Sequence, residues 1–565
     1  MIKINRLQKY FFNALIVSIA SIVIHSISVS FNIFVSGKIG SEAMGLITLV
    51  SGVYSFAITL ATSGINLAVV RLVSGALPYK EKSSSLDKKS HTRVRKIMIN
   101  ALLYCLFFSI FASILLFLLS RAIGDYLLDD SRVILSLRVM SFTLVPIAVS
   151  SMINGYFCAV RRVYKNVIVQ FCEQGIKIGV TSALLVLIAP AGIEYACISI
   201  ALGGLVAEIG SMIINITLYF FDRVLHKKKQ SDKEIICSIL SKKLEHVSNF
   251  ESTKKPFWSK IKELFKTSFK NEKGETVFSI AFPVAISAYV RSALSTVEHL
   301  TIPWGLKKSG LKASVALSSY GVLHGMVFPL IFFPASVLGA FSSLLVPEVA
   351  SSYEAKDFAR IRYIVSRVFG FSLLFSLGVS GIFISFSSEI GICFFNSYEA
   401  GRFIRLISPL IPLMYLDGAV DAMLKGVGEQ IYSMRVNIID SIVSVLLVVI
   451  LLPKMGIDGY IVVIFITELL NTSLSIIKLL SKTGVKAKIF KWIIMPTISI
   501  ILSTIITRLI FDHFLTSIFN NFFFGKSFII IKIVICAMLY FLFSNALGSI
   551  SKEEYSLVKR ALKAT

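Results

Sequence analysis

The 565-residue chain is poor in acidic residues and in cysteine. It has 32 Asp and Glu against 58 Lys and Arg, which gives a formal net charge of +26. Its seven cysteines show no paired spacing, so a disulfide framework and a zinc site are not expected. The sequence contains no Walker loop, no metal-ligand cluster and no Gly-x-Ser-x-Gly motif. We therefore expect no catalytic residues, no metal and no cofactor, and a protein that is not an enzyme.

Long apolar runs dominate what is present. The mean hydropathy is +0.79 and 55% of the residues are hydrophobic. About twenty apolar residues span a bilayer, and backbone amides in lipid must be satisfied within the segment, so such runs predict helices. The first run, from Phe11, is too long for a signal-peptide core and is expected to be a retained helix. The fourteen predicted spans are 11–36, 44–72, 97–120, 133–159, 166–189, 193–221, 277–302, 316–346, 364–387, 403–424, 432–452, 457–480, 491–511 and 527–548.

The first twelve spans carry the same landmarks twice. Three sequence matches occur in the same order, with offsets of 276, 271 and 264 residues. The matches are Met44-Gly45 with Tyr320-Gly321, Met152-Ile-Asn-Gly155 with Met423-Leu-Lys-Gly426, and Gly192-Ile193-Glu194 with Gly456-Ile457-Asp458. They predict an all-α polytopic membrane protein with two six-helix lobes related by an internal repeat, plus two C-terminal helices.

This repeat sets the predicted domains. They are a six-helix lobe at 1–222, a basic cytoplasmic linker at 223–276, a second six-helix lobe at 277–482, and two extra helices with a tail at 483–565. The linker holds fourteen Lys and Arg against seven Asp and Glu. Its apolar residues recur at helical spacing, which fits either amphipathic helices on the inner leaflet or a solvated linker with short helices.

The positive charge follows the connecting segments. Lys and Arg gather in every second connection, which favours a plasma-membrane protein with both termini in the cytoplasm. The basic inner surface is expected to attract anionic lipids. No nucleic-acid-binding motif accompanies the charge, so nucleic acid is not an expected partner.

Several motifs resemble one family of membrane proteins. They are Tyr320-Gly-Val-Leu-His-Gly325, Gly155-Tyr156-Phe157 with Gln170-Phe-Cys-Glu173-Gln174, and Leu424-Lys425-Gly426-Val427-Gly428. These segments are similar to signatures of the stage V sporulation protein B-like polysaccharide transporters of the multidrug/oligosaccharidyl-lipid/polysaccharide (MOP) exporter superfamily. Family members often have Arg-Gly-Tyr-Phe-Gln-Gly where this chain has Asn154-Gly-Tyr-Phe-Cys158-Ala159.

The resemblance implies a flippase that moves a polyprenyl-pyrophosphate-linked sugar, such as lipid II, by alternating access. One alternative is a cation-coupled multidrug exporter of the same superfamily. Another is a non-transporting membrane scaffold that docks cell-wall synthesis enzymes through the linker. Deleting the linker discriminates the scaffold, which should lose its function, from a flippase, which should retain basal transport.

Charges within the predicted spans are candidate binding residues, because charge in hydrocarbon is costly. Arg291 lies near the middle of the seventh span, where it could bind a pyrophosphate or pair with an acid on another helix. Lys177 and Glu173 are spaced to pair with each other, or they could line a polar cavity wall. Arg71 ends the second span and could contact substrate or reach lipid phosphates.

Further candidates are His25, Glu298 and four acids. His25 sits in the first span, where a single His is more often a helix contact than a proton carrier. Glu298 and His299 lie near the predicted external end of the seventh span, either as a gate or as interfacial caps. Candidates for cation coupling are Asp417, Asp421, Asp440 and Glu468, which could instead serve helix–helix hydrogen bonding.

Overall fold

The computed structural model describes residues 2–76, 84–188, 192–241, 277–511 and 526–549. All secondary structure in these ranges is helical, as predicted. Within them, nine helices are long and apolar enough to cross a membrane, or ten if one bent helix pair counts as a single span. The chain is therefore a multi-pass, all-α membrane protein. Within the described ranges, the fourteen predicted spans fall largely on helical chain, while the number of crossings stays a prediction.

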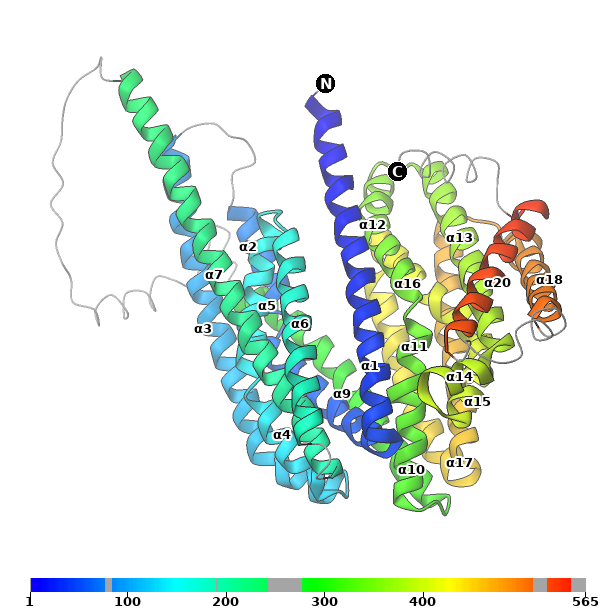
Figure 1. The fold of residues 1–565 in the computed structure, drawn as a ribbon. Coiled ribbons are helices and arrows are strands. Elements are labelled where there is room, and N and C mark those ends of the chain that lie inside the picture. The colour runs from blue at the N-terminus through cyan, green and yellow to red at the C-terminus, as the bar shows by residue number, and fades with distance from the viewer. Residues whose placement is uncertain (1, 77–83, 189–191, 242–276, 512–525, 550–565) are drawn as a thin grey trace. The chain divides into compact units, whose positions relative to one another are not determined.

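The described chain forms two compact units (Figure 1). The smaller unit is 53–293, and the larger unit comprises 1–52 and 294–565, so the division falls inside the helices α1 and α9. The first helices in order are α1 (Ile2–Thr62), α2 (Ile65–Ala76), α3 (Ser84–Ala122), η1 (Ile123–Leu127), η2 (Ser131–Val133), α4 (Ile134–Ser141), α5 (Leu144–Ala159), α6 (Tyr164–Leu187), α7 (Ile193–Ser241) and α9 (Val277–Lys308). They continue with α10 (Ala313–Tyr320), η4 (Gly321–Val327), α11 (Phe328–Phe332), α12 (Ala335–Glu354), α13 (Phe358–Ser385), α14 (Ser387–Phe395), α15 (Tyr398–Ile407), η5 (Ser408–Leu410), α16 (Ile411–Gly426), α17 (Gln430–Thr483), η6 (Phe490–Ile494), α18 (Met495–Leu509) and α20 (Lys526–Ala546).

The two longest helices each contain a glycine that breaks the helical path. Gly40 in α1 has φ 79° and ψ 176°, and Gly456 in α17 has φ 60° and ψ −140°. These conformations favour glycine because it has no Cβ. The 54 residues of α17 would extend about 80 Å at 1.5 Å per residue, far beyond the roughly 30 Å of hydrocarbon. Each break lies in a predicted connection, so α1 and α17 each hold two consecutive spans or parts of spans.

Two predicted spans are less regular than expected. The second span is interrupted at Ser63 and Gly64, which both have positive φ. Gly64 lies so close to the carbonyl oxygen of Ala281 that a Cβ there would be 2.9 Å from that atom. The eighth span contains the π-helical segment η4 between α10 and α11. Pro329 and Pro334 follow it, and the helix is interrupted before α12 begins at Ala335.

The repeated glycines have matching structural roles. A Cβ at Gly155 of α5 would lie 2.8 Å from the backbone of Asn66 in α2, and one at Gly426 of α16 would lie 2.9 Å from Val349 in α12. Each glycine thus lets one helix approach the helix that ends the second or eighth span. Asn166 donates a hydrogen bond to the carbonyl of Asn154 at 3.2 Å, which explains its place after the first motif.

One ion-pair cluster ties the helices of the first repeat. Asp222 of α7 is fully buried and accepts from Lys165 at 2.5 Å and from Arg162. Tyr156 of α5 also donates to Asp222, at 3.4 Å. Arg162 lies in the connection after α5, and Lys165 lies in the first turn of α6. This Asp222 cluster therefore joins three consecutive helices, α5, α6 and α7.

A second ion-pair cluster lies at the corresponding place in the second predicted repeat. Glu429, in the connection between α16 and α17, pairs with Lys482 at 2.7 Å and with Lys478 at 3.4 Å. Lys478 also lies 4.9 Å from the ring centre of Tyr432. The Glu429 cluster therefore joins the start of α17 to its end, and its side chains are partly exposed.

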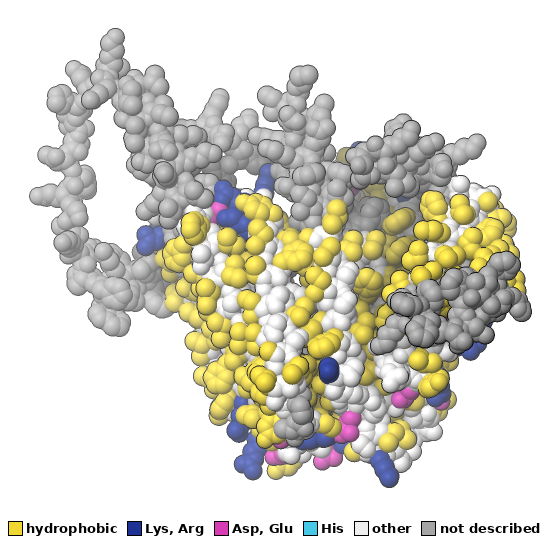
Figure 2. Space-filling view, viewed as in Figure 1, with side chains coloured by type: hydrophobic (Ala, Val, Ile, Leu, Met, Phe, Trp, Pro, Cys, Tyr) yellow, Lys and Arg dark blue, Asp and Glu magenta, His cyan; other side chains and the backbone are white. Residues whose placement is uncertain are grey.

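The two extra helices pack against the second repeat. A Cβ at Gly378 of α13 would lie 2.5 Å from the ring of Tyr540 in α20, and one at Gly381 would lie 2.2 Å from Ile500 in α18. These glycines leave no room for a side chain, so α18 and α20 lie directly on α13. Figure 2 shows hydrophobic side chains over much of the visible surface, as expected for helices that face lipid.

Candidate functional site

A mixed-charge group lies between α6 and α7 in the smaller unit. Glu173 of α6 lies near Ser211 of α7, and Lys177 is its electrostatic neighbour. Glu208, also on α7, interacts with both Glu173 and Lys177. The predicted pair is thus part of a three-charge group with a net charge of −1, which Tyr54 of α1 also adjoins.

Arg291 and Arg71 are the other two basic candidates in this unit. Arg291 on α9 is exposed, and no carboxylate among the described residues of the smaller unit forms an ion pair with it. Arg71 is exposed on α2, beside the buried Leu72 and Val73. A guanidinium on a spanning helix is costly in hydrocarbon, so Arg291 requires water, a headgroup or a bound anion.

Four carboxylates converge in the larger unit. Asp440 of α17 is an electrostatic neighbour of Glu298 of α9 and of Asp417 of α16. Glu468, on the second half of α17, neighbours Asp417 and Asp440. Three helical segments that are distant in sequence therefore bring together the acids that we call the acidic cluster: Glu298, Asp417, Asp440 and Glu468.

The acidic cluster is incompletely satisfied. Ser444 donates to Glu298 at 2.6 Å, and Thr472 donates to Glu468 at 2.9 Å. One oxygen of Asp417 and one of Asp440 are buried without a hydrogen-bond partner. Burying neighbouring carboxylates is unfavourable unless a proton or a cation offsets their charge. In the described ranges, no group of three or more His, Cys, Asp and Glu side chains is arranged to hold a metal ion.

Asp421, the remaining acidic candidate, is held near the end of α16. It accepts a hydrogen bond from Ser433 at 2.5 Å and lies 4.0 Å from Lys425. The hydrogen bond with Ser433 connects α16 to α17. His25 is exposed on α1, outside the acidic cluster.

The sequence reasoning named His299 beside Glu298 but missed the histidine–tyrosine group to which His299 belongs. His299 Nδ1 lies 2.9 Å from Tyr320 Oη, and His324 Nε2 lies 2.9 Å from Tyr460 Oη. The two imidazole ring centres are 5.1 Å apart. His324 lies in the π-helical segment η4, a distortion often found at functional sites. The available signal was the presence of these four polar side chains in three otherwise apolar predicted spans, the seventh, the eighth and the twelfth.

Parts of the predicted linker lie outside the described residues. Helix α7 continues to Ser241 and so includes the first proposed amphipathic stretch, while 242–276, with the second stretch, is not described.

Comparisons with known proteins agree with the fold and the motifs. Residues 11–239 match the family described as polysaccharide biosynthesis protein, and residues 308–450 match the MatE family. Stage V sporulation protein B of Bacillus subtilis (strain 168) is 23% identical over 457 residues, which cover 80% of each chain. The predicted resemblance to stage V sporulation protein B is thus confirmed.

Solved structures share the architecture. The lipid II flippase MurJ in an inward closed conformation has a TM-score of 0.63 at 13% identity, over 94% of this chain and 99% of that chain. An inward-facing multidrug resistance MATE family transporter of the MOP superfamily has a TM-score of 0.56 at 14% identity, over 83% and 98% of the two chains. These likenesses establish a MATE- and MurJ-like transporter fold.

Proposed function

We propose that this chain, a membrane protein with a MurJ- and MATE-like fold, is a flippase for a lipid-linked cell-wall precursor. It moves lipid II or a related polyprenyl-pyrophosphate-linked oligosaccharide from the inner to the outer leaflet of the plasma membrane by alternating access. Both termini lie in the cytoplasm. The similarity to Stage V sporulation protein B and the MurJ-like fold support this substrate class over a drug.

The observation that carries the proposal is the state of Arg291. Its guanidinium is exposed on a helix predicted to span the membrane, and no ion pair with a described carboxylate of its own unit neutralises it. A pyrophosphate offers two adjacent anionic groups that a guanidinium binds with bidentate geometry. Lys177 and Arg71 are the further cationic contacts in the proposal, with Glu173 beside Lys177.

A close contact between repeated motifs supports alternating access. Gly45 of α1 and Gly321 of η4 lie so close that a Cβ on Gly321 would be 2.4 Å from the Gly45 nitrogen. The hydroxyls of Ser41 and Ser318 are hydrogen-bonded at 2.6 Å in the same region. Two glycines without side chains allow a contact that can form and separate with little steric cost. We propose that this contact closes the external side.

The acidic cluster is the proposed coupling site. A proton or cation bound by Asp417, Asp440 and Glu468 would offset their mutual repulsion, and its release would favour another arrangement of α16 and α17. One charge crossing 100 mV yields about 2.3 kcal/mol, enough to bias such a change. The same acids would suit a cation-coupled multidrug exporter, which is the second candidate.

The first test is lipid II binding to the purified full-length protein, measured by native mass spectrometry. Arg291→Ala should weaken binding about tenfold, which corresponds to about 1.4 kcal/mol. Arg435→Ala removes one exposed positive charge from α17 and serves as the matched control. Unchanged binding in Arg291→Ala would remove Arg291 from the substrate site, and no binding by the wild type would contradict the lipid II assignment.

A transport assay in liposomes separates the candidates. The flippase should expose fluorescent lipid II at the outer leaflet, and Asp440→Asn should reduce the dependence of the rate on an imposed proton or sodium gradient. Gradient-driven ethidium transport without lipid II movement would favour the multidrug exporter. Full transport after deletion of 242–276 would exclude a scaffold that acts only through this linker.

A further inference from the structure

A pocket lies where α14 and α15 form a short helical hairpin. Asn396 between the two helices adopts a left-handed conformation with φ 50°. Ser397 then caps α15, because its hydroxyl accepts from the Ala400 amide at 3.1 Å. Gly391 and Gly401 hold the helices in close contact, since a Cβ on Gly391 would lie 2.4 Å from the Gly401 nitrogen. The pocket wall is therefore a defined, tightly packed element.

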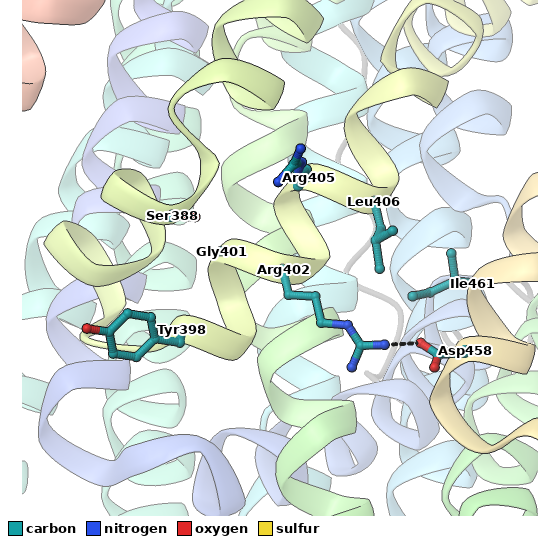
Figure 3. A pocket seen from close by; sticks show the side chains of 8 residues that line it. All are labelled: Ser388, Tyr398, Gly401, Arg402, Arg405, Leu406, Asp458 and Ile461. Carbon is teal, nitrogen blue, oxygen red and sulfur yellow. Dashed lines mark hydrogen bonds and ion pairs between the residues drawn. The ribbon is translucent and has the colours of Figure 1, made fainter. Parts of the chain in front are cut away.

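The amphipathic sequence of α15 gives the pocket its character. One face of the helix is buried and consists of Ala400, Gly401, Phe403, Ile404 and Ile407. The other face presents Arg402, Arg405 and Leu406 to a cavity of about 650 Å³ (Figure 3). Asp458 and Ile461 of α17 form the facing wall. The cavity thus combines a basic side with apolar side chains.

The charges in the pocket do not balance. Arg402 forms an ion pair with Asp458 at 2.6 Å, and both side chains are about half exposed. Arg405, one turn further along α15, has no ion-pair or hydrogen-bond partner among the described residues. The pocket therefore carries a net charge of +1, with one guanidinium available to an anion and a second held nearby by a carboxylate.

The fold places this pocket at the opposite end of the helices from the Glu429 cluster. Helix α16 leads from the α15 side to Glu429, and both ends of α17 lie at the Glu429 cluster. Asp458 follows the break at Gly456, in the middle of α17. With the predicted orientation, the pocket faces the outer side. Tyr398 is 79% exposed at its rim, as aromatic residues at a membrane interface often are.

We propose that this pocket binds the phosphate group of an anionic lipid headgroup from the outer leaflet. The Arg405 guanidinium contacts the phosphate oxygens, and Arg402 joins it when it leaves Asp458. Leu406 and Ile461 contact the apolar part of the lipid next to its headgroup, and Tyr398 lies at the interface. The combination of basic and apolar lining favours a lipid phosphate over a free phosphate ion.

Lipid binding to the detergent-purified full chain tests the proposal without any transport step. Phosphatidylglycerol and inorganic phosphate are titrated separately, with phosphatidylcholine as the reference lipid. Arg405→Gln should weaken phosphatidylglycerol binding about tenfold, the loss expected for one charge-assisted contact. Arg405→Lys should bind phosphatidylglycerol with an affinity between those of the wild type and Arg405→Gln, because lysine keeps the charge but loses the bidentate geometry. Asp458→Asn should tighten binding, because it releases Arg402.

The control is Lys312→Gln, which removes one exposed charge from the connection before α10, outside the pocket. It should leave phosphatidylglycerol binding unchanged, and the thermal unfolding midpoints of all variants should agree. Equal phosphatidylglycerol binding by wild type, Arg405→Gln and Arg402→Gln would overturn the site. Arg405-dependent binding of inorganic phosphate without phosphatidylglycerol binding would overturn the lipid assignment. Neither result bears on lipid II transport, so failure here is distinct from failure of the flippase proposal.

Discussion

The Asp222 and Glu429 clusters lie at corresponding positions of the two predicted repeats, with the charges exchanged. In the first predicted repeat, the cations lie on the connection after α5 and at the start of α6, and the acid lies on α7. In the second predicted repeat, the acid lies on the connection after α16, and the cations lie near the end of α17. In both cases an ion pair attracts a connection between two helices to a later helix segment. The attraction is the same whichever of the two carries the acid.

The two clusters differ in burial as well as in polarity. The Asp222 side chain is fully buried, whereas Glu429 is 22% exposed and Lys482 is 41% exposed. Removing one partner of a buried pair leaves a charge without compensation, while exposed pairs contribute little because water already solvates both charges. The first repeat should therefore depend on its cluster much more than the second.

The largest expected effect comes from Asp222→Ala. It leaves Arg162 and Lys165 without their shared carboxylate and should lower the free energy of unfolding by about 3–5 kcal/mol. Thermal unfolding of the purified protein in detergent measures the change. Asp125→Ala is the matched control, because Asp125 pairs with Arg121 at 3.5 Å on the exposed surface of the same unit. If both variants lowered the unfolding temperature equally, the distinction between buried and exposed pairs would be wrong.

A compensating double substitution should recover part of this loss. Asp222→Leu combined with Lys165→Met removes the buried charge together with its most buried partner, and replacing a buried pair by apolar residues is often neutral. Arg162 is 30% exposed and can turn toward solvent. We expect the double variant to unfold at a higher temperature than Asp222→Leu alone. A lower temperature would show that specific hydrogen-bond geometry outweighs charge compensation here.

Glu429→Ala should have a much smaller effect. Lys478 and Lys482 can both reach water after the carboxylate is removed, so the shift should be about a fifth or less of that for Asp222→Ala. The same unfolding assay gives this ratio directly. Comparable losses of stability in Glu429→Ala and Asp222→Ala would mean that the two clusters differ only in which side carries the acid, and not in their dependence on burial.

The smallest effect is the pH dependence of the Glu429 cluster. The hydrogen bond from Lys482 and the charge of Lys478 hold the pKa of Glu429 below its usual range. The unfolded carboxyl then takes up a proton first as the pH falls, so the stabilisation is complete above the usual pKa and is lost as the pH falls through the folded value. The difference in unfolding midpoint between wild type and Glu429→Gln should shrink between about pH 6 and about pH 3. Glu348→Gln, from the exposed pair with Arg360, controls for the loss of a carboxylate.

The local sequence predicted structure well at positions where only glycine fits, either because φ is positive or because two helices are in close contact. Gly192 and Gly456 were paired by the repeat, and both have positive φ. Gly155 and Gly426 were paired in the same way, and both permit close helix contacts. Such positions require glycine because a Cβ would clash or strain the backbone, so the sequence marks them directly.

Long-range neighbours could not be found in this way. Asp417, Asp440 and Glu468 were predicted as separate candidates, but the sequence did not say that Glu298 of α9 lies beside Asp440. The π-helical path of η4, which carries His324 to Tyr460, also has no local signature that we used. Arg402 and Arg405 were unremarked because the partner of Arg402 and the facing pocket wall, both on α17, lie more than fifty residues away.

The sequence by itself determined that this is a helical membrane protein, because apolar length acts within single segments. It also predicted an internal repeat from the placement of glycines. Only the tertiary structure decided which charges meet. It grouped four acids in the larger unit, left Arg291 without an ion pair to a described carboxylate of its own unit, and buried Asp222 while exposing Glu429. Charge interactions depend on distance and burial in space, and helix packing sets both.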